Sequence, residues 1–156
     1  MDEHKEYLSK EKHHELVVEL ESLTHDRRKE IAEMLEAAKA LGDLSENAEY
    51  HAAREQQAAV EERIMKLESI LKNAVIITDK HRVDVASIGS TVILRRGKSK
   101  TTETYLIVGS EEADISAGKI SNKSPLGEAI FGKKKGDEVV FHAPGGEQTC
   151  EIVDIQ

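Results

Sequence analysis

Apolar residues in the first half of the chain recur at steps of three and four positions, the repeat of one face of an α-helix. Two such series are separated by one break. A stripe this narrow is typical of a coiled-coil seam rather than of a helix with a broad core face. Ser9, ahead of the first series, suits the N-cap position. The first series is Leu16, Leu20, Leu23, Arg27, Ile31, Met34, Ala38 and Leu41, and the second is Ala53, Gln57, Val60, Ile64, Leu67, Leu71 and Ala74.

The two series are joined by the segment 42–47, Gly-Asp-Leu-Ser-Glu-Asn, the one strong break in this half. Helices joined by so short a loop fold back on one another as an antiparallel hairpin. Each expected helix has about 30 residues and rises ~1.5 Å per residue, so the hairpin reaches about 45 Å. A two-helix hairpin of that length is not compact, and we expect it to project, with the loop at its tip.

The second half has the pattern of short strands. Segments rich in β-branched and aromatic residues, bounded by turn residues, are 91–94, 104–108, 138–142 and 149–153. The segment 143–147 predicts a hairpin connection between the last two strands. The segment 124–132 predicts a short helix with Ser124 at the N-cap, Pro125 at the first helical position and Gly132 at the C-cap. The expected fold class is therefore α+β, with a long helical hairpin followed by a small α+β domain.

Composition divides the 156 residues near residue 78. Residues 1–78 hold 11 Lys and Arg against 18 Asp and Glu, with one Gly and no Pro. Residues 79–156 hold 11 against 12, with the other nine Gly and both Pro. Helix-forming residues and most of the negative charge therefore lie in the first part, and turn residues in the second. We expect a coiled-coil domain over 1–78, with an acidic tip near 42–47, and a globular domain over 79–156.

The net charge of −8 restricts the classes of function. So acidic a chain is a poor general binder of duplex DNA, because contacts to phosphates need clustered cations. The single Cys150 excludes an internal disulfide and a Cys-based zinc site, and favours a reducing compartment. No apolar run approaches the roughly 18 residues of a membrane span, and the N-terminus lacks a signal-peptide pattern. We therefore expect a cytoplasmic protein with no membrane partner.

The tip carries two carboxylates, Asp43 and Glu46, three positions apart. One interpretation is a capping box, in which both side chains accept backbone N–H groups at the start of the second helix. The other is a site for Mg²⁺, which typically binds protein through one or two carboxylates and completes its shell with water and substrate phosphates. An exposed tip has no pocket that excludes water, so the second interpretation requires insertion into another protein's active site.

The segment 42–57, Gly-Asp-Leu-Ser-Glu-Asn-Ala-Glu-Tyr-His-Ala-Ala-Arg-Glu-Gln-Gln, is very similar to the tip segment of GreA-type bacterial transcript cleavage factors, the Gre family. The resemblance covers nearly the whole chain and favours the metal interpretation of the tip. Further matching residues are Arg27, Arg28, Glu30, Ile31, Gly109, Glu112, Ala113, Asp114, Ile120, Ser121, Ser124, Pro125, Leu126, Ile130, Gly132, Pro144, Gly145, Gly146 and Glu147.

The resemblance implies both a fold and an activity. Gre factors have an N-terminal antiparallel coiled coil and a C-terminal domain with a fold like the FK506-binding proteins. The globular domain docks on the rim of the secondary channel of RNA polymerase, and the coiled coil threads down that channel. The tip then stimulates the polymerase's own Mg²⁺-dependent cleavage of backtracked RNA, which rescues arrested elongation complexes. Such a factor is not a free-standing enzyme.

By the same resemblance, Asp43 matches the metal-assisting position and Glu46 the second acidic position, assigned to water or metal support. The two are the expected catalytic and metal-binding residues of a two-metal site. The Mg²⁺ is shared with the polymerase and is not bound stably by this chain alone. The implied partners are RNA polymerase and, through it, the 3′ end of the nascent RNA. Sequence-specific DNA binding is not expected.

Four more residues near the tip match family positions. Lys39 and Arg54 match basic positions that face RNA or the channel, or they lie on a solvated helix face with pairs such as Tyr50–Arg54. Tyr50 could stack on a base, or it could brace the end of the hairpin. Asn47 could orient Glu46 or extend the cap.

Three positions depart from the family pattern. Lys29 stands where Pro is common, which removes a kink and predicts a straighter hairpin. Ser45 stands where Lys is frequent and leaves the tip more negative, and Lys12 replaces a common Gly. None of these changes touches the acidic pair.

Three rival functions remain. A channel-binding inhibitor on the same scaffold would be expected to change the tip acids, and Asp43 with Glu46 argues against it. A prolyl isomerase is suggested only by fold analogy, and two Phe with no Trp do not readily build an aromatic-lined pocket. A plain coiled-coil scaffold would not need so specific a tip.

Overall fold

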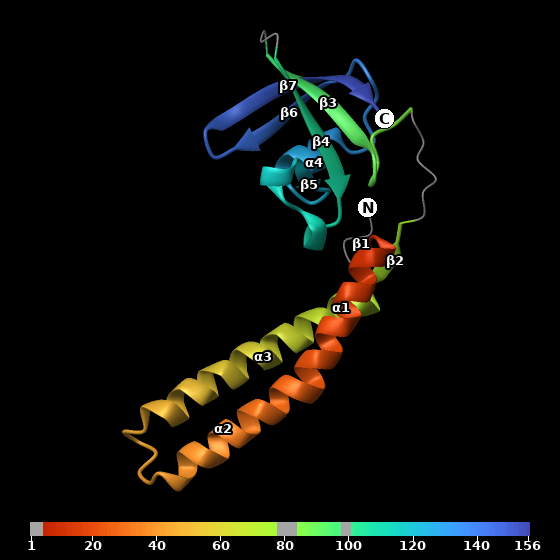
Figure 1. Ribbon diagram of the computed structural model, residues 1–156. Helices are drawn as coiled ribbons and strands as arrows, with labels where there is room; N and C mark the ends of the chain where they lie inside the picture. Colours follow the sequence, from red (N-terminus) through yellow and green to blue (C-terminus); the bar gives the residue numbers. More distant parts are fainter. Residues whose placement is uncertain (1–4, 78–83, 98–100) are drawn as a thin grey trace. The chain divides into compact units, whose positions relative to one another are not determined.

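The computed structural model describes residues 5–77, 84–97 and 101–156. The contacts divide the chain into two compact units (Figure 1). The helical unit is His13–Ala74, and the sheet unit joins the residues up to Lys12 to Val75–Gln156. The boundary expected near residue 78 lies outside the described residues. Within the described ranges, no helix is both long and apolar enough to cross a membrane.

The helical unit is the expected antiparallel hairpin (Figure 1). Its first arm consists of α1 (Lys10–Ser22), a π-helical turn (Leu23–Arg27) and α2 (Arg28–Ala40), and its second arm is α3 (Ala48–Lys72). The N-cap expected at Ser9 is confirmed, because its hydroxyl oxygen accepts the Lys12 N–H at 3.1 Å. The seam is apolar, as the spacing predicts. Its buried residues are Leu16, Ile31, Ala38, Ala53, Ile64 and Leu67.

Two residues assigned to the seam are exposed instead, so the prediction is wrong for them. Met34 is 41% exposed, and the half-buried Leu35 follows Ile31 at four positions rather than three. Leu41 is 70% exposed because α2 ends at Ala40 and the chain leaves the helix there. After Ile31, apolar residues stand both three and four positions further on, at Met34 and Leu35. Packing against the other arm decides which of the two faces the seam.

The π-helical turn Leu23–Arg27 is a feature that the spacing does not predict. It lies two residues before Lys29, at a point where we expected a regular arm. A π turn inserts an extra residue into the helix and is itself a recognised cause of bending. The first arm is therefore not an uninterrupted α-helix, although position 29 holds Lys rather than Pro.

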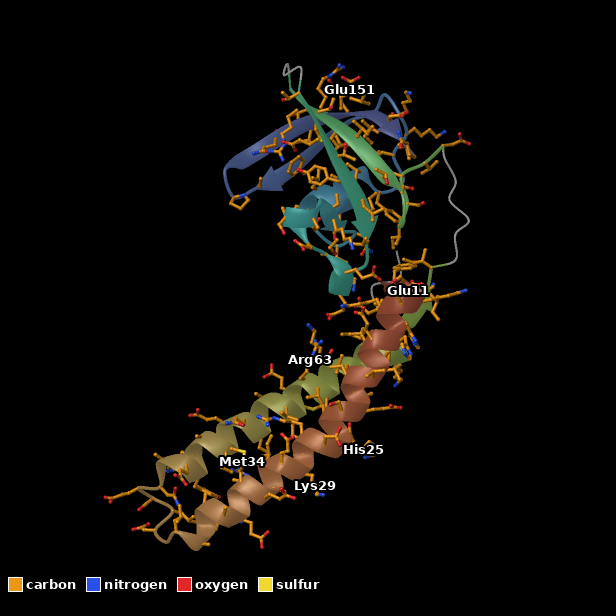
Figure 2. The ribbon with its side chains drawn as sticks, in the orientation of Figure 1. Glu11, His25, Lys29, Met34, Arg63 and Glu151 are labelled. Carbon is orange, nitrogen blue, oxygen red and sulfur yellow. The ribbon has the colours of Figure 1, made fainter. Side chains whose placement is uncertain are left out.

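Polar contacts join the two arms along the seam. Arg63 donates to both carboxylate oxygens of Glu19, at 2.7 and 2.8 Å. Arg28 pairs in the same two-pronged way with Glu61, at 2.7 and 2.6 Å. Arg27, the polar member of the first series, donates to the Gln56 amide oxygen at 2.8 Å. The side chains along the arms, Arg63 and Met34 among them, are drawn in Figure 2.

The sheet unit holds a five-stranded sheet of order β5-β4-β3-β7-β6 (Figure 1). Its strands are β3 (Thr91–Arg96), β4 (Thr102–Val108), β5 (Lys119–Ser121), β6 (Glu138–Ala143) and β7 (Gly146–Ile155). The pairings are antiparallel except that between β4 and β5. Each strand segment expected from the sequence lies inside an observed strand, whereas the three-residue β5 was not predicted.

One short helix, α4 (Pro125–Ile130), lies at the expected place. The Ser124 hydroxyl oxygen accepts the Gly127 N–H at 3.1 Å, which confirms the N-cap. The helix ends earlier than expected, with its C-cap at Phe131, and Gly132 follows it with a φ of +77°. The sheet packs one face into an apolar core that includes the fully buried Ile107 and Ile152.

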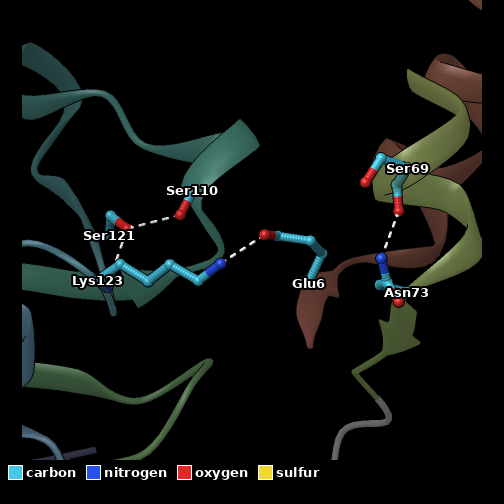
Figure 3. A network of polar contacts seen from close by, with 6 residues as sticks. All are labelled: Glu6, Ser69, Asn73, Ser110, Ser121 and Lys123. Atoms are coloured by element: carbon cyan, nitrogen blue, oxygen red, sulfur yellow. Dashed lines mark hydrogen bonds and ion pairs between the residues drawn. The ribbon is translucent and has the colours of Figure 1, made fainter. Parts of the chain in front are cut away.

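The N-terminal strand belongs to the sheet unit by its contacts. β1 (Glu6–Leu8) pairs with β2 (Ala74–Ile76) in a two-stranded sheet, and Leu8 is buried. Glu6 forms an ion pair with Lys123, as Figure 3 shows. The next residue in the chain after β1, Ser9, donates its N–H to the Glu112 carboxylate at 2.7 Å. Residues at the start of the chain are therefore held by residues more than a hundred positions away.

Candidate functional site at the hairpin tip

The tip is the loop between Ala40, where α2 ends, and Ala48, where α3 begins. Its residues from Leu41 to Glu46 are all exposed. Gly42 takes a φ of +112°, a backbone region that favours glycine, so the chain reverses there without strain. The loop therefore presents exposed side chains at the closed end of the hairpin.

Asn47 joins the ends of the two helices. Its side-chain oxygen accepts the Tyr50 N–H at 3.0 Å, which makes it the N-cap of α3. Its side-chain Nδ2 donates to the Ala38 carbonyl oxygen in the last turn of α2, at 2.7 Å. One side chain thus satisfies an orphan donor of one helix and adds a second hydrogen bond to a carbonyl at the end of the other, which also accepts the Leu41 N–H. Asn47 was expected either to orient Glu46 or to extend the cap. In the structure it caps α3, and among the described residues it makes no hydrogen bond to Glu46.

The capping-box interpretation of Asp43 and Glu46 is wrong. The second helix starts after Asn47, so neither carboxylate lies at its N-cap or in its first turn. Asp43 instead accepts two hydrogen bonds from Ser45 on the same oxygen, Oδ1, at 2.9 Å from the backbone N–H and 2.7 Å from the hydroxyl. Among the described residues, the exposed Glu46 carboxylate has no hydrogen-bond or ion-pair partner. Both carboxylates are therefore free of the helix.

The hydrogen bonds at the tip favour the ionised form of Asp43. The backbone N–H and then the hydroxyl of Ser45 lower the pKa of the Asp43 carboxyl below its ordinary value. In the parts of the chain that the structure describes, no group of three or more His, Cys, Asp or Glu is placed to hold a metal ion. The two carboxylates of the tip would therefore be at most part of the coordination shell of a metal ion.

The remaining candidates lie on the helices beside the loop. Lys39 and Arg54 are both exposed, and Arg54 donates to Gln57 at 2.9 Å rather than contacting Tyr50. The half-buried Tyr50 ring meets the His51 ring edge-on, with centroids 5.9 Å apart and an angle of 68° between planes. The structure therefore places two exposed cations beside the tip and a half-buried tyrosine in the first turn of α3, which leaves both interpretations of Tyr50 open.

Sequence reasoning missed a groove of about 290 Å³ on the sheet unit. Its walls are largely apolar, and one of them carries Ile115, which is 81% exposed. Other lining residues are Tyr105, Ile120, Leu126, Phe141 and Pro144. The full lining comes from β3, β4, β5 and β6, from α4 and from three connections, so no local pattern in the sequence could have brought it together.

Two family descriptions together match almost the whole chain. Residues 6–76 match "Transcription elongation factor, N-terminal", and residues 80–156 match "Transcription elongation factor, GreA/GreB, C-term". Transcription elongation factor GreA of Geobacillus kaustophilus is 46% identical, over 100% of both chains. The GreA of Bacillus cereus is 47% identical, over 88% of both chains.

Solved structures of related factors also align along the chain. The GreA factor homolog 1 (Gfh1) of Thermus thermophilus is 29% identical, covers 97% of this chain and 99% of that chain, and gives a TM-score of 0.45. The Gfh1 of Thermus aquaticus is 27% identical, with a TM-score of 0.46 over 98% of this chain. The two family descriptions cover the N-terminal and the C-terminal part of the chain, and the Geobacillus protein is 46% identical over its full length. The chain belongs to the GreA/GreB family of transcription elongation factors.

Proposed function

We propose that this chain is an accessory factor of bacterial RNA polymerase that stimulates the polymerase's own Mg²⁺-dependent cleavage of backtracked RNA and so rescues arrested elongation complexes. One observation carries the proposal: Asp43 and Glu46 are both exposed, and free of the helices, at the closed end of a long hairpin. A helical scaffold would need no carboxylates there. Membership of an elongation-factor family supports the same role.

The donor set at the tip fits a Mg²⁺ ion that is shared with another protein. Mg²⁺ keeps several water and phosphate ligands and needs only one or two carboxylates from a protein. When bound, the ion lowers the pKa of its water and offsets charge on the phosphate that is attacked. In this proposal Asp43 binds the ion, and Glu46 supports the same ion or orients the attacking water. The cut releases the extruded 3′ end and leaves a new 3′-OH in register.

The hairpin is long and narrow enough to enter a channel. The 25 residues of α3, at about 1.5 Å each, make an arm of roughly 37 Å. Each helix with its side chains is about 10–12 Å across, so two side by side remain narrow. Such a hairpin can enter a channel that excludes a folded domain. In the secondary channel, the exposed Lys39 and Arg54 would face the RNA phosphates.

The sheet unit would supply the contact with the polymerase surface. Its apolar groove and the exposed Ile115 have the character of an interface, because exposed apolar surface beside polar residues marks binding sites. Polymerase is thus the direct partner, and the 3′ end of the nascent RNA is reached through it. A partner of this kind would place the protein in the cytoplasm.

The proposal is tested on stalled, backtracked elongation complexes carrying RNA labelled at its 3′ end. Adding the full chain with Mg²⁺ should release short labelled fragments much faster than polymerase alone, and omitting Mg²⁺ should abolish their release. Slower elongation without cleavage would instead assign an inhibitor that occupies the channel. No effect on the complexes at all would refute the proposed function.

A further inference from the structure

We infer that Ser45 is a positioning residue that holds the Asp43 carboxylate in one orientation at the tip; this inference rests on the function proposed above. The Ser45 backbone N–H and hydroxyl both donate to Asp43 Oδ1, at 2.9 and 2.7 Å. Two donors on one oxygen restrict rotation of the carboxylate about its side-chain bonds. The other oxygen, Oδ2, accepts no hydrogen bond from any described residue, so it is left for a ligand.

The contact between Asp43 and Ser45 is not needed to cap a helix. The same arrangement occurs at Asp114 and Ser116, where Oδ1 accepts the Ser116 N–H at 3.0 Å and its hydroxyl at 2.5 Å. There it caps the 3-10 turn Ile115–Ala117. At the tip, by contrast, the following helix has its own cap in Asn47. The tip contact closes the turn from Asp43 to Ser45 without capping a helix, and it also fixes the orientation of the carboxylate.

Ser45 is in turn connected to α3. The His51 Nε2 atom lies 3.4 Å from the Ser45 carbonyl oxygen. Because a carbonyl oxygen only accepts, the imidazole donates from Nε2 in this contact. His51 also meets the Tyr50 ring edge-on. A chain of contacts thus runs from the first turn of α3 through Ser45 to Asp43.

Orientation matters because an exposed aspartate otherwise samples several rotamers. A carboxylate that must meet a metal ion in another protein's active site loses that freedom on binding, and an orientation fixed beforehand reduces the loss. Only the hydroxyl donor depends on the side chain at position 45, because the backbone N–H is present with any residue except proline.

The test compares the full chain with Ser45→Ala, which removes only the hydroxyl, and with Ser45→Thr, which keeps it. Cleavage of backtracked RNA is measured at saturating factor across a range of Mg²⁺ concentrations. Losing one hydrogen bond to a charged group should slow cleavage about three- to tenfold at limiting Mg²⁺. The Mg²⁺ concentration for half-maximal rate should rise by a similar factor, and Ser45→Thr should restore both. The factor concentration that gives half-maximal cleavage should stay the same in all three proteins.

Three results would overturn the inference while leaving the proposed function intact. Ser45→Ala could cleave as fast as the unchanged chain at every Mg²⁺ concentration. Ser45→Thr could be as slow as Ser45→Ala, which would show that the hydroxyl is not the cause. Ser45→Ala could alter only the factor concentration needed, which would make Ser45 a binding residue. If the unchanged chain stimulates no cleavage, the proposed function and this inference fall together.

Discussion

At the scale of single residues, Asn47 is the side chain that closes the tip. It caps α3 through the Tyr50 N–H and donates to the Ala38 carbonyl oxygen of α2. Asn47→Ala removes both contacts and should lower the free energy of unfolding of the hairpin by about 1–3 kcal/mol. Asn47→Ser keeps a capping oxygen but is too short to reach Ala38, and should lose about half as much. Urea unfolding followed by far-UV circular dichroism measures both losses, and equal losses would show that the cap contributes nothing.

The Asp43 carboxyl should titrate at a lower pH than an aspartate without hydrogen-bond donors. Its pKa is lowered by the Ser45 N–H and hydroxyl, so Ser45→Ala should raise it toward the ordinary value. A carboxyl with a lower pKa in the folded state stabilises the fold above its unfolded pKa, and that stabilisation is lost as the pH falls through the folded value. Carboxyl chemical shifts followed by NMR report this pKa directly. Identical titration in the two proteins would mean that the hydroxyl does not bond to Asp43 in solution.

The acidic pair could be predicted from the sequence, but the cap could not. Asp43, Ser45 and Asn47 are all residue types that cap helices. Which of them does so depends on where the helix starts, and that is decided by Asn47 reaching back to Ala38 on the other helix. Such a contact between helices has no signature in the spacing of one segment.

At the scale of elements, the apolar seam should stabilise the hairpin far more than the ion pairs across it. Leu67 is fully buried, so Leu67→Ala should cost about 2–5 kcal/mol. Glu19→Gln breaks the pair with Arg63 at the partly exposed edge and should cost much less, because such pairs contribute little in water. Thermal unfolding at equal protein concentration compares the two. A larger loss from Glu19→Gln would contradict this order.

Elements with a strong repeat were predictable, and short ones were not. The spacing located both arms, and the alternation of β-forming residues located the four long strands. β1 and β5 have three residues each, too few to show an alternation, and their pairing partners stabilise them. The π turn Leu23–Arg27 contains neither Pro nor Gly, so no helix-breaking residue marks it.

At the scale of the whole molecule, the start of the chain is part of the sheet unit. A Cβ atom added to Gly109 would lie 1.8 Å from the Tyr7 carbonyl oxygen, which is backbone and cannot yield cheaply. Gly109→Ala should therefore displace β1 and lower the unfolding temperature of the sheet unit. Gly145→Ala is the matched control, because no atom lies within 4 Å of its added Cβ. Calorimetry should show a clear fall for the first variant only, and unchanged unfolding in Gly109→Ala would refute this packing.

The division of the chain by composition could not predict the contact between Tyr7 and Gly109. It groups residues that are neighbours in sequence, whereas Tyr7 and Gly109 meet only after folding. The groove of the sheet unit escaped prediction for the same reason, since its lining comes from several strands and loops. The expected function came from the family resemblance rather than from the spacing of residue types. The tip motif could be recognised because its residues are consecutive in the sequence, whereas the residues of the groove are not.

The central claim is that the charge of Asp43 acts on a metal ion during RNA cleavage. Asp43→Asn tests it most directly, because the amide oxygen can still accept from Ser45 and only the charge is lost. In backtracked complexes with Mg²⁺, stimulated cleavage should fall at least about a hundredfold, because changes outside the coordination shell already cost about 10–100-fold and Asp43 is proposed to contact the ion directly through its charge. Displacement of labelled unchanged protein from polymerase should need the same concentration as before. Cleavage at the normal rate by Asp43→Asn would contradict the account.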